Sequence, residues 1–456
     1  MPAFTSIQCI PNEILAEIFQ HYLSQAHFGH ASLLKILAQV CSNWQKVVLF
    51  SPSLWNTITL VAGKDEILPS PHSIVERIQR SGSLPLDITV VIDFYPSVPP
   101  DPMYLQVLIP FAERWRTLTL HIPFIMLEPI LHHGTLYLPQ MRTLSVCTTS
   151  ILPSDLLCAF KNAPQLLSFT VTSHKQAPSL NAASSFTISF STLTVLNMHV
   201  GPNGGVLCPV AFHHILSHCR RLEGCSIGLK DFDSNPSSLD WCESVGEPVV
   251  LPRLLDLSIS FSGSFGSPQF LSSCILPALR NFQLHFETPA SIQGRVPIPG
   301  ILLGLYFKSS FSLIHFELSG TDEDFYTDEL IDLLMRFRSL QSVLFMDCFI
   351  DIQDLFKALI MQSDNPSSSL LPNLSSIGIV QRRHHSIAVD HGPDDDDCIV
   401  DMIYSRLLAT STQQVFEVEV EVFGRRLRED VWERFLALQE EWKDVALLRM
   451  KTCEQD

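Results

Sequence analysis

The residues best suited to metal chemistry are the histidines of the segment HHILSHC at 213–219. On a helix, His214 and His218 stand four residues apart and share one face, with Cys219 adjacent, so the two imidazoles could bind one metal ion. The sequence identifies no further ligand for such an ion. An ordinary helix on the outer, convex face explains the pair better, and we predict no metal site.

A second group of potential ligands lies in RRHHSIAVDHGPDDDD at 382–397. Its histidines and its acidic run Asp394 to Asp397 could bind a divalent ion weakly. However, Gly392 and Pro393 interrupt regular structure, and adjacent carboxylates repel one another. The segment therefore predicts a solvated loop.

The sequence shows no arrangement of residues typical of an enzyme. It has no G-x-S-x-G nucleophile elbow, no G-x-x-x-x-G-K-[ST] phosphate loop and no H-E-x-x-H zinc helix. GPNGG at 201–205 is rich in glycine but lacks the lysine and hydroxyl residue of a phosphate loop, so it predicts a connecting loop. We expect a protein that is not an enzyme and uses no cofactor.

Composition narrows the classes of partner. The chain has 456 residues, a formal net charge of −17 and only 17% charged residues, which argues against nucleic-acid and membrane partners. The start MPAFTSIQ has no basic segment before an apolar one, and no segment predicts a membrane span. Twelve cysteines without a C-x-x-C pair favour buried thiols, so we expect a reducing compartment, the cytoplasm or the nucleus.

The first fifty-five residues predict a small helical module. IPNEILAEIFQHYL at 10–23 predicts a helix that starts at Pro11 and carries a broad apolar stripe. The stripe comprises Ile14, Leu15, Ile18, Phe19, Tyr22 and Leu23. A second helical pattern runs from Leu33 to Val48, and Pro52 ends it. So small a module buries little surface, so it should pack on another part of the chain.

A short pattern, L-x-x-L-x-L, recurs through the remaining four hundred residues. Its middle positions are Leu118, Leu144, Phe169, Leu196, Cys225, Leu257, Phe282, Phe316, Val343 and Ile377. The steps range from 25 residues (144 to 169) to 34 residues (282 to 316). Helical patterns separate the copies, at 154–163, 210–219, 328–337, 352–363 and 398–408. One strand and one helix per unit predict a solenoid with a parallel sheet.

The N-terminal module resembles an F-box, in a version common among fungal F-box families. The motifs that carry the resemblance are I-P-x-E-I-L, V-C-x-x-W and S-P-x-L-W, in this order. The resemblance implies docking onto a Skp-type adaptor, which binds a cullin. The implied adaptor contacts are Ile10, Pro11, Ile14, Leu15, Ile18, Leu37, Val40 and Trp44. Pro11, Ile14 and Leu15 are favoured among them, Leu37 and Trp44 are also expected to pack internally, and Ile18, Phe19 and Leu23 could serve either surface. Alternatively, all are core residues of a helical cap.

The rest of the chain resembles a degenerate leucine-rich-repeat array. The fold class is therefore α/β, with an F-box module at 1–56 and, at 57–456, a curved parallel sheet with outer helices. Two early strands around Ile58 and Ile88 connect them, and VFEVEVEVF with the helix that follows forms a C-terminal cap. Insertions predict loops at 231–250, 287–300, 362–370 and 381–398.

Strand alternation gives the residues that face the concave side of such an array. This face carries mostly neutral hydrogen-bonding groups, which favours recognition by hydrogen bonds and shape. The most informative side chains are His121, Asn197, His199, Asn281, Gln283, His285, His315 and Glu317. Alternatively, small serines and threonines simply suit a tightly curved sheet.

Together these patterns predict a substrate-recognition subunit of an SCF-type cullin-RING ubiquitin ligase. The module would bind the adaptor, the array would bind a target protein, and catalysis would follow from proximity. The main alternative is a repeat scaffold that regulates a partner without ubiquitination, and a more distant one is a hydrolase hidden in degenerate repeats.

Overall fold

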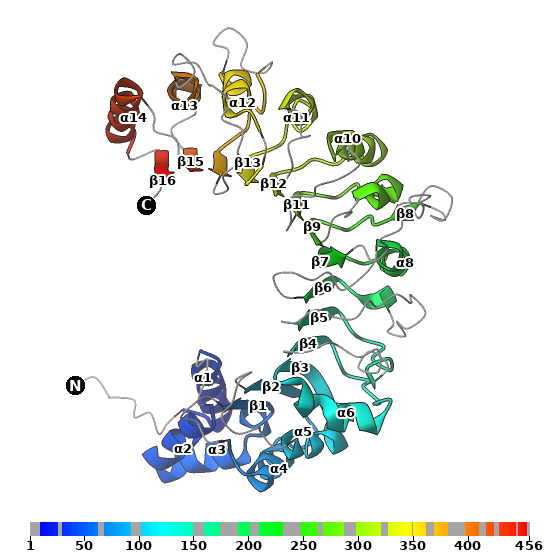
Figure 1. Cartoon of the computed structure of the whole chain (residues 1–456). Helices are drawn as coiled ribbons and strands as arrows, with labels where there is room; N and C mark the ends of the chain where they lie inside the picture. Colours follow the sequence, from blue (N-terminus) through cyan, green and yellow to red (C-terminus); the bar gives the residue numbers. More distant parts are fainter. Residues whose placement is uncertain are drawn as a thin grey trace, which may run out of the picture. The chain divides into compact units, whose positions relative to one another are not determined.

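The chain folds as short strands that alternate with helices (Figure 1). The computed structural model describes residues 10–25, 30–62, 68–92, 102–148, 159–173, 190–200, 209–230, 248–262, 268–286, 298–320, 327–348, 350–361, 369–381, 397–409, 416–423, 428–443 and 446–453. It divides into two compact units, Met1–Gly204 and Gly205–Asp456. This division lies inside the predicted array, and the boundary predicted at 56/57 stays a prediction. The mixed α/β class is confirmed.

The first unit begins with the helices α1 (Asn12–Ser24), α2 (His30–Val40) and α3 (Ser42–Phe50). Pro11 is the N-cap of α1 and has an extended backbone, whereas the sequence predicted it as the first residue inside the helix. Glu13 lies in the first turn, where its negative charge interacts favourably with the positive end of the helix dipole. Cys41 caps α3, since its Sγ accepts a hydrogen bond from the Trp44 backbone N–H at 3.5 Å. Pro52 starts the short helix η2 (Pro52–Leu54) directly afterwards.

These helices share a core of their own. Its buried members are Leu15, Phe19, Leu23, Leu34, Leu37, Val47, Val48, Leu54 and Trp55. The ring of Trp44 packs edge-on against Phe19, with centroids 4.7 Å apart. Trp55 donates a hydrogen bond from Nε1 to the Val48 carbonyl at 2.6 Å, and the Arg80 guanidinium lies 4.8 Å from the centre of its ring. Because Arg80 ends α4 (Pro71–Arg80), the helices are fixed to the start of the sheet, as so small a module requires.

Six parallel strands follow one another in the first unit, each paired with the next along the chain. They are β1 (Thr57–Ala62), β2 (Leu86–Ile92), β3 (Trp115–His121), β4 (Thr143–Thr148), β5 (Ser168–Ser173) and β6 (Val195–Val200). Besides α4, the connections contain α5 (Met103–Gln106), η3 (Ile109–Arg114), η4 (Phe124–Leu127), α6 (Glu128–His133) and η6 (Phe190–Thr192). The predicted strands are confirmed, whereas the helix α4 was not predicted.

The second unit repeats this arrangement with eight parallel strands in chain order. They are β7 (Gly224–Lys230), β9 (Asp256–Ser262), β11 (Asn281–Phe286), β12 (His315–Ser319), β13 (Ser342–Met346), β14 (Ser376–Gln381), β15 (Phe416–Phe423) and β16 (Ala446–Cys453). The short strands β8 (Val249–Val250) and β10 (Cys274–Ile275) pair separately. The helical elements are α8 (Pro209–His218), η8 (Pro268–Ser273), α10 (Ile298–Ser309), α11 (Thr327–Leu334), α12 (Ile352–Leu359), α13 (Asp397–Ala409) and α14 (Glu429–Glu441).

In the second unit the helices cover one face of the strands (Figure 1). Phe282 and Phe316 are register partners on β11 and β12, and Phe345 on β13 pairs with Leu318 two residues further along; all three phenylalanines are buried on this face. The centroids of Phe282 and Phe316 are 6.1 Å apart, and those of Phe316 and Phe345 are 6.3 Å apart. Since side chains alternate along a strand, the neighbours of these phenylalanines point away from the helices.

Several sequence predictions need correction in this unit. The loop predicted at 287–300 ends earlier, because α10 begins at Ile298, and the loop predicted at 231–250 includes β8. The last strand, β16, was not predicted at all. Residues 149–158, 201–208 and 382–396 lie outside the described residues. They include the first half of the helix predicted at 154–163, the GPNGG segment, and the histidines and Asp394 to Asp396 of the predicted acidic loop.

A buried arginine on α13 binds three backbone carbonyls between the end of α12 and the start of β14. Arg406 on α13 donates from Nε to the Leu359 carbonyl at 3.0 Å and from its terminal nitrogens to those of Leu371 and Leu370, at 2.8 and 2.6 Å. Leu359 is the last residue of α12, so Arg406 satisfies a carbonyl left over at a helix end. Burial lowers the pKa of Arg406 to about 10, so it stays charged at neutral pH.

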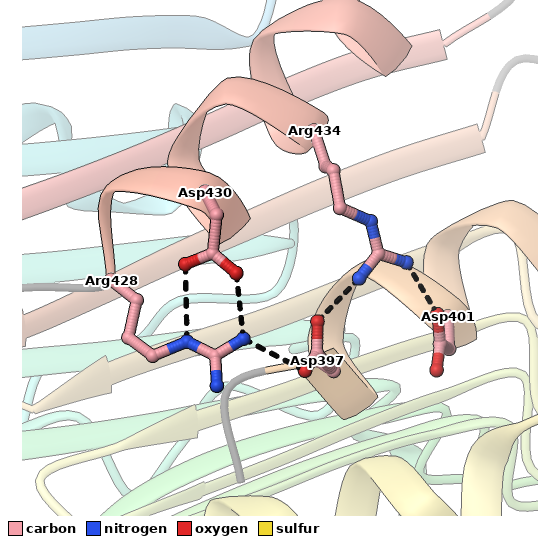
Figure 2. A network of polar contacts seen from close by, with 5 residues as sticks. All are labelled: Asp397, Asp401, Arg428, Asp430 and Arg434. Carbon is pink, nitrogen blue, oxygen red and sulfur yellow. Dashed lines mark hydrogen bonds and ion pairs between the residues drawn. The ribbon is translucent and has the colours of Figure 1, made fainter. Parts of the chain in front are cut away.

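An exposed ion network joins α13 to α14 (Figure 2). Arg428 binds Asp397 at 3.0 Å and Asp430 at 2.8 Å. Arg434 binds Asp397 as well, and reaches Asp401 at 2.8 Å. Asp397 therefore does not extend the predicted loop, because it starts α13 and pairs with two arginines from the predicted C-terminal cap.

Candidate functional site

An uncovered apolar stripe runs along α1. Ile14, Ile18 and Tyr22 are 46%, 48% and 51% exposed, and their spacing of four residues puts them on one face of the helix. Ile36 and Val40 on α2 are exposed too, again four residues apart. We call these five residues the helical surface. Exposed apolar groups collected in this way are typical of a protein-binding site.

The predicted adaptor contacts differ in exposure and fall into three sets. Pro11, Ile14, Ile18 and Val40 are exposed, while Ile10 and Trp44 are half-buried. Leu15 and Leu37 are buried inside the helical core, at 1% and 7% exposed, which leaves little apolar side-chain surface for a partner.

Leu15, a favoured contact in the sequence prediction, is 1% exposed in this structure, and its contact with an adaptor stays a prediction. It lies four residues before Phe19 and eight before Leu23, and all three form the inward stripe of α1. This stripe also settles the alternatives left open by the sequence. Ile18 belongs to the outer surface, and Phe19 and Leu23 belong to the core.

Sequence reasoning missed part of the exposed apolar surface. Ile36 on α2 and Leu49 and Phe50 at the end of α3 are exposed, and Phe50 is 80% exposed. The signal for Ile36 was present, because it lies outside the spacing of the buried residues Leu34 and Leu37.

A polar cluster lies on the strand face that points away from the helices in the second unit. It consists of Gln283 and His285 on β11 and of His315 and Glu317 on β12, and we call it the β11–β12 cluster. Gln283 donates from Nε2 to the Glu317 carboxylate at 2.9 Å. His285 Nδ1 lies 2.8 Å from the Ser319 hydroxyl, and His315 Nδ1 lies 3.0 Å from that of Ser342. Four of the eight predicted contact residues are thus neighbours in space.

The centre of this cluster is a nearly buried carboxylate. Glu317 is 8% exposed, and its oxygens lie 4.0 Å from His285 Nδ1 and 3.7 Å from His315 Nε2. Burial lowers the pKa of His285, and the negative charge of Glu317 opposes this effect only in part. A carboxylate at the centre of such a cluster attracts a cationic group.

The other predicted contacts lie apart from the cluster's centre. Asn281 binds the Asp256 carboxylate on the neighbouring strand β9. In the first unit, Asn197 donates to the Thr170 hydroxyl at 3.3 Å. His121 and His199, on β3 and β6, share a register row but are separated by β4 and β5.

The histidine pair of α8 does not form a metal site with its neighbouring cysteine. The rings of His214 and His218 are 4.8 Å apart on the exposed side of the helix, whereas Cys219 is buried. Across the described residues, no group of three or more histidines, cysteines or acidic residues is arranged to hold a metal ion. Nor does any described helix combine the length and the apolar character needed to cross a bilayer.

Comparison with known families identifies the helical part of the chain. Residues 7–61 match the family model described as F-box-like. The matched segment contains α1, α2, α3 and η2 and reaches into β1. No curated protein matches the chain. The N-terminal resemblance is therefore supported as an F-box-like domain, and it includes the helical surface.

Proposed function

We propose that this chain is the substrate-recognition subunit of an SCF-type cullin-RING ubiquitin ligase. The observation that carries the proposal is the F-box-like domain at 7–61, because domains of this kind generally bind Skp-type adaptors. The helical surface supports it, since Ile14, Ile18 and Tyr22 are apolar and uncovered by the described chain.

The strand and helix repeats form the target-binding part in this proposal. Each unit carries parallel strands in chain order, which is compatible with a solenoid, and we assign them to a leucine-rich-repeat array. The half-buried polar residues on the face opposite the helices, among them the β11–β12 cluster, would contact a target protein.

The chain itself supplies position and no reacting group. Holding a target lysine near a ubiquitin-carrying enzyme raises the effective concentration of the reacting groups, which is sufficient for catalysis by proximity. We place the complex in the cytoplasm or nucleus, with a Skp-type adaptor, a cullin and a target protein as partners and with no nucleic-acid or membrane partner. The net charge of −17 is consistent with this choice.

A co-purification experiment tests the proposal. The full chain is expressed with a Skp-type adaptor and a cullin, and both should be recovered with the wild type. Ile14→Asp combined with Ile18→Asp should abolish recovery, because two carboxylates would replace the centre of the apolar stripe. Ile125→Asp is the matched control, since Ile125 is 46% exposed in η4 of the same unit, outside the F-box-like segment.

Recovery of the adaptor by the double variant at the wild-type level would contradict the assigned docking surface. Recovery of the adaptor without the cullin by the wild type would instead favour a repeat scaffold that regulates its partner without ubiquitination. Ubiquitination of a co-purified target in the reconstituted complex would then separate the two functions directly.

A further inference from the structure

The open strand face of the second unit carries an apolar strip between two acidic ones. In one register row, Glu317 of β12 lies opposite Leu344 of β13, Leu344 opposite Gly378 of β14, and Gly378 opposite Glu419 of β15. In the next row, Met346 and Val380 continue the apolar strip toward Glu421. These residues come from consecutive strands of one sheet, so their order is fixed by the register.

The apolar strip is shallow at its centre because Gly378 has no side chain. A Cβ atom placed there would lie only 2.6 Å from Leu344 Cδ1, so the Leu344 side chain occupies the space above the glycine. Leu344 and Met346 stay half-buried, whereas Val380 is buried beside them. The strip is therefore a shallow apolar surface, which we call the apolar seat, and it does not project from the sheet.

At one acidic border of the strip, no lysine or arginine of the described residues pairs with the carboxylate of Glu317. Within the described part of the chain, the ion-pair partners of Glu317 are His285 and His315, at 4.0 and 3.7 Å. Histidine is mostly neutral at neutral pH, and burial lowers the pKa of His285 further. Gln283 supplies one neutral hydrogen bond. A buried carboxylate with this environment is stabilised by an added cation.

The other border is acidic as well. Glu417, Glu419 and Glu421 alternate along β15 and are half-buried on the same face, opposite Leu447, Arg449 and Lys451 of the last strand. In the register, Arg449 lies opposite Glu419 and Lys451 opposite Glu421, and these are the two glutamates that border the strip. The charge preference of the strip is therefore set by Glu317, which favours a positively charged occupant over an acidic one.

We propose that this face binds a segment of the target protein in which a lysine or arginine stands close to an apolar side chain. The cation lies on Glu317, and the apolar group lies on Leu344 and Met346 above Gly378. The inference rests on the proposed function, since it specifies what the array holds. Neighbouring strands are about 4.8 Å apart, so Glu317 and the strip are one to two strand spacings apart, which an extended peptide spans in about one to three residues.

A peptide display library tests this inference on the full chain bound to its adaptor. The wild type should select peptides with a lysine or arginine within about three residues of an apolar residue. Glu317→Gln keeps the shape of the side chain but removes its charge, so it should weaken binding of a selected peptide at least about tenfold and abolish the preference for a basic residue. Glu329→Gln is the control, because it removes the same charge from an exposed position on α11.

A second variant tests the apolar seat. Gly378→Leu would fill the space that the Leu344 side chain now occupies. It should weaken binding of the same peptide even though Glu317 is unchanged. Thermal unfolding of each variant shows whether the unit still folds, and Leu344→Ala provides a smaller change at the same place.

The inference is overturned if the wild type selects peptides without a basic residue, or if Glu317→Gln and Glu329→Gln bind the selected peptide equally well. Either result leaves adaptor and cullin recovery unchanged, and so leaves the proposed function in place. Failure to recover the adaptor would contradict the proposed function, whatever peptides the chain selects.

Discussion

Leu15 and Ile14 are neighbours in α1, yet Leu15 is 1% exposed and Ile14 is 46% exposed. One residue corresponds to about 100° of helix rotation, which turns one side chain into the core and the other outward. Variants of Leu15 therefore test the folding of the helices, whereas variants of Ile14 test the docking of a partner that we propose.

Leu15→Ala should lower the free energy of unfolding of the helical core by about 2–5 kcal/mol, because it leaves a cavity beside Phe19. Ile14→Ala should change it by less than about 0.5 kcal/mol, since the side chain already contacts solvent. Hydrogen exchange of the α1 and α3 amides measures both variants. Equal protection in the two variants would contradict the assigned inward stripe.

The helices α1, α3 and α8 and most strands of the main sheet were predictable because their apolar spacing is regular. The core contacts of α1 were not, since Ile14 and Leu15, and likewise Ile18 and Phe19, are adjacent apolar pairs that fit either face. The helix α10 was missed because IPGILLGLYFKS is apolar on almost every side and shows no clear period. The contacts within the β11–β12 cluster could not be predicted without the strand register, which brings Gln283 beside Glu317 across 34 residues of sequence.

Arg406 should be far more important for stability than an exposed arginine. Arg406→Met leaves buried carbonyls of Leu359, Leu370 and Leu371 without this donor, so the second unit should lose about 3 kcal/mol or more. Arg434→Met is the control, because its ion pairs are exposed and such pairs contribute about 0–1 kcal/mol. Urea unfolding of both variants provides the comparison, and equal losses would contradict the role of Arg406.

The stability of the second unit should decrease in mild acid. Burial holds the pKa of His285 below its ordinary value, so the unfolded chain binds a proton more readily than the folded one. This contribution is complete above the unfolded pKa of about 6.5 and is lost as the pH falls through that value toward the folded pKa. Thermal unfolding at about pH 7.5 and about pH 5.5 measures the loss.

His285→Gln should reduce this loss without removing it. His213 has a pKa that burial and His214 lower in the same way, and it remains in the variant. His72→Gln is the control, because the His72 side chain is 85% exposed in the first unit. A pH dependence in His285→Gln equal to that of the wild type would show that His285 does not contribute.

The buried thiols of the second unit should resist alkylation in the folded chain. Burial raises the pKa of Cys219 and Cys274 to about 12, and the pKa of Cys225 is raised as well. Because the thiolate is the reactive form, these residues should react with iodoacetamide only after unfolding. Differential labelling with mass spectrometry checks this, with the half-buried Cys41 of the first unit as the comparison. Rapid labelling of Cys225 in the native chain would contradict its burial.

The chain-order pairing of the strands also bears on how the protein is made. Within each unit every strand of the main sheet pairs with the one that precedes it in that sheet, so the sheet grows from its first strand without waiting for a distant segment. A nascent chain leaving the ribosome N-terminus first can therefore fold progressively, because each new strand finds its pairing partner already in place. The last described strand, β16, carries Arg449, whose charge is of the kind that discourages another chain from pairing with a strand edge.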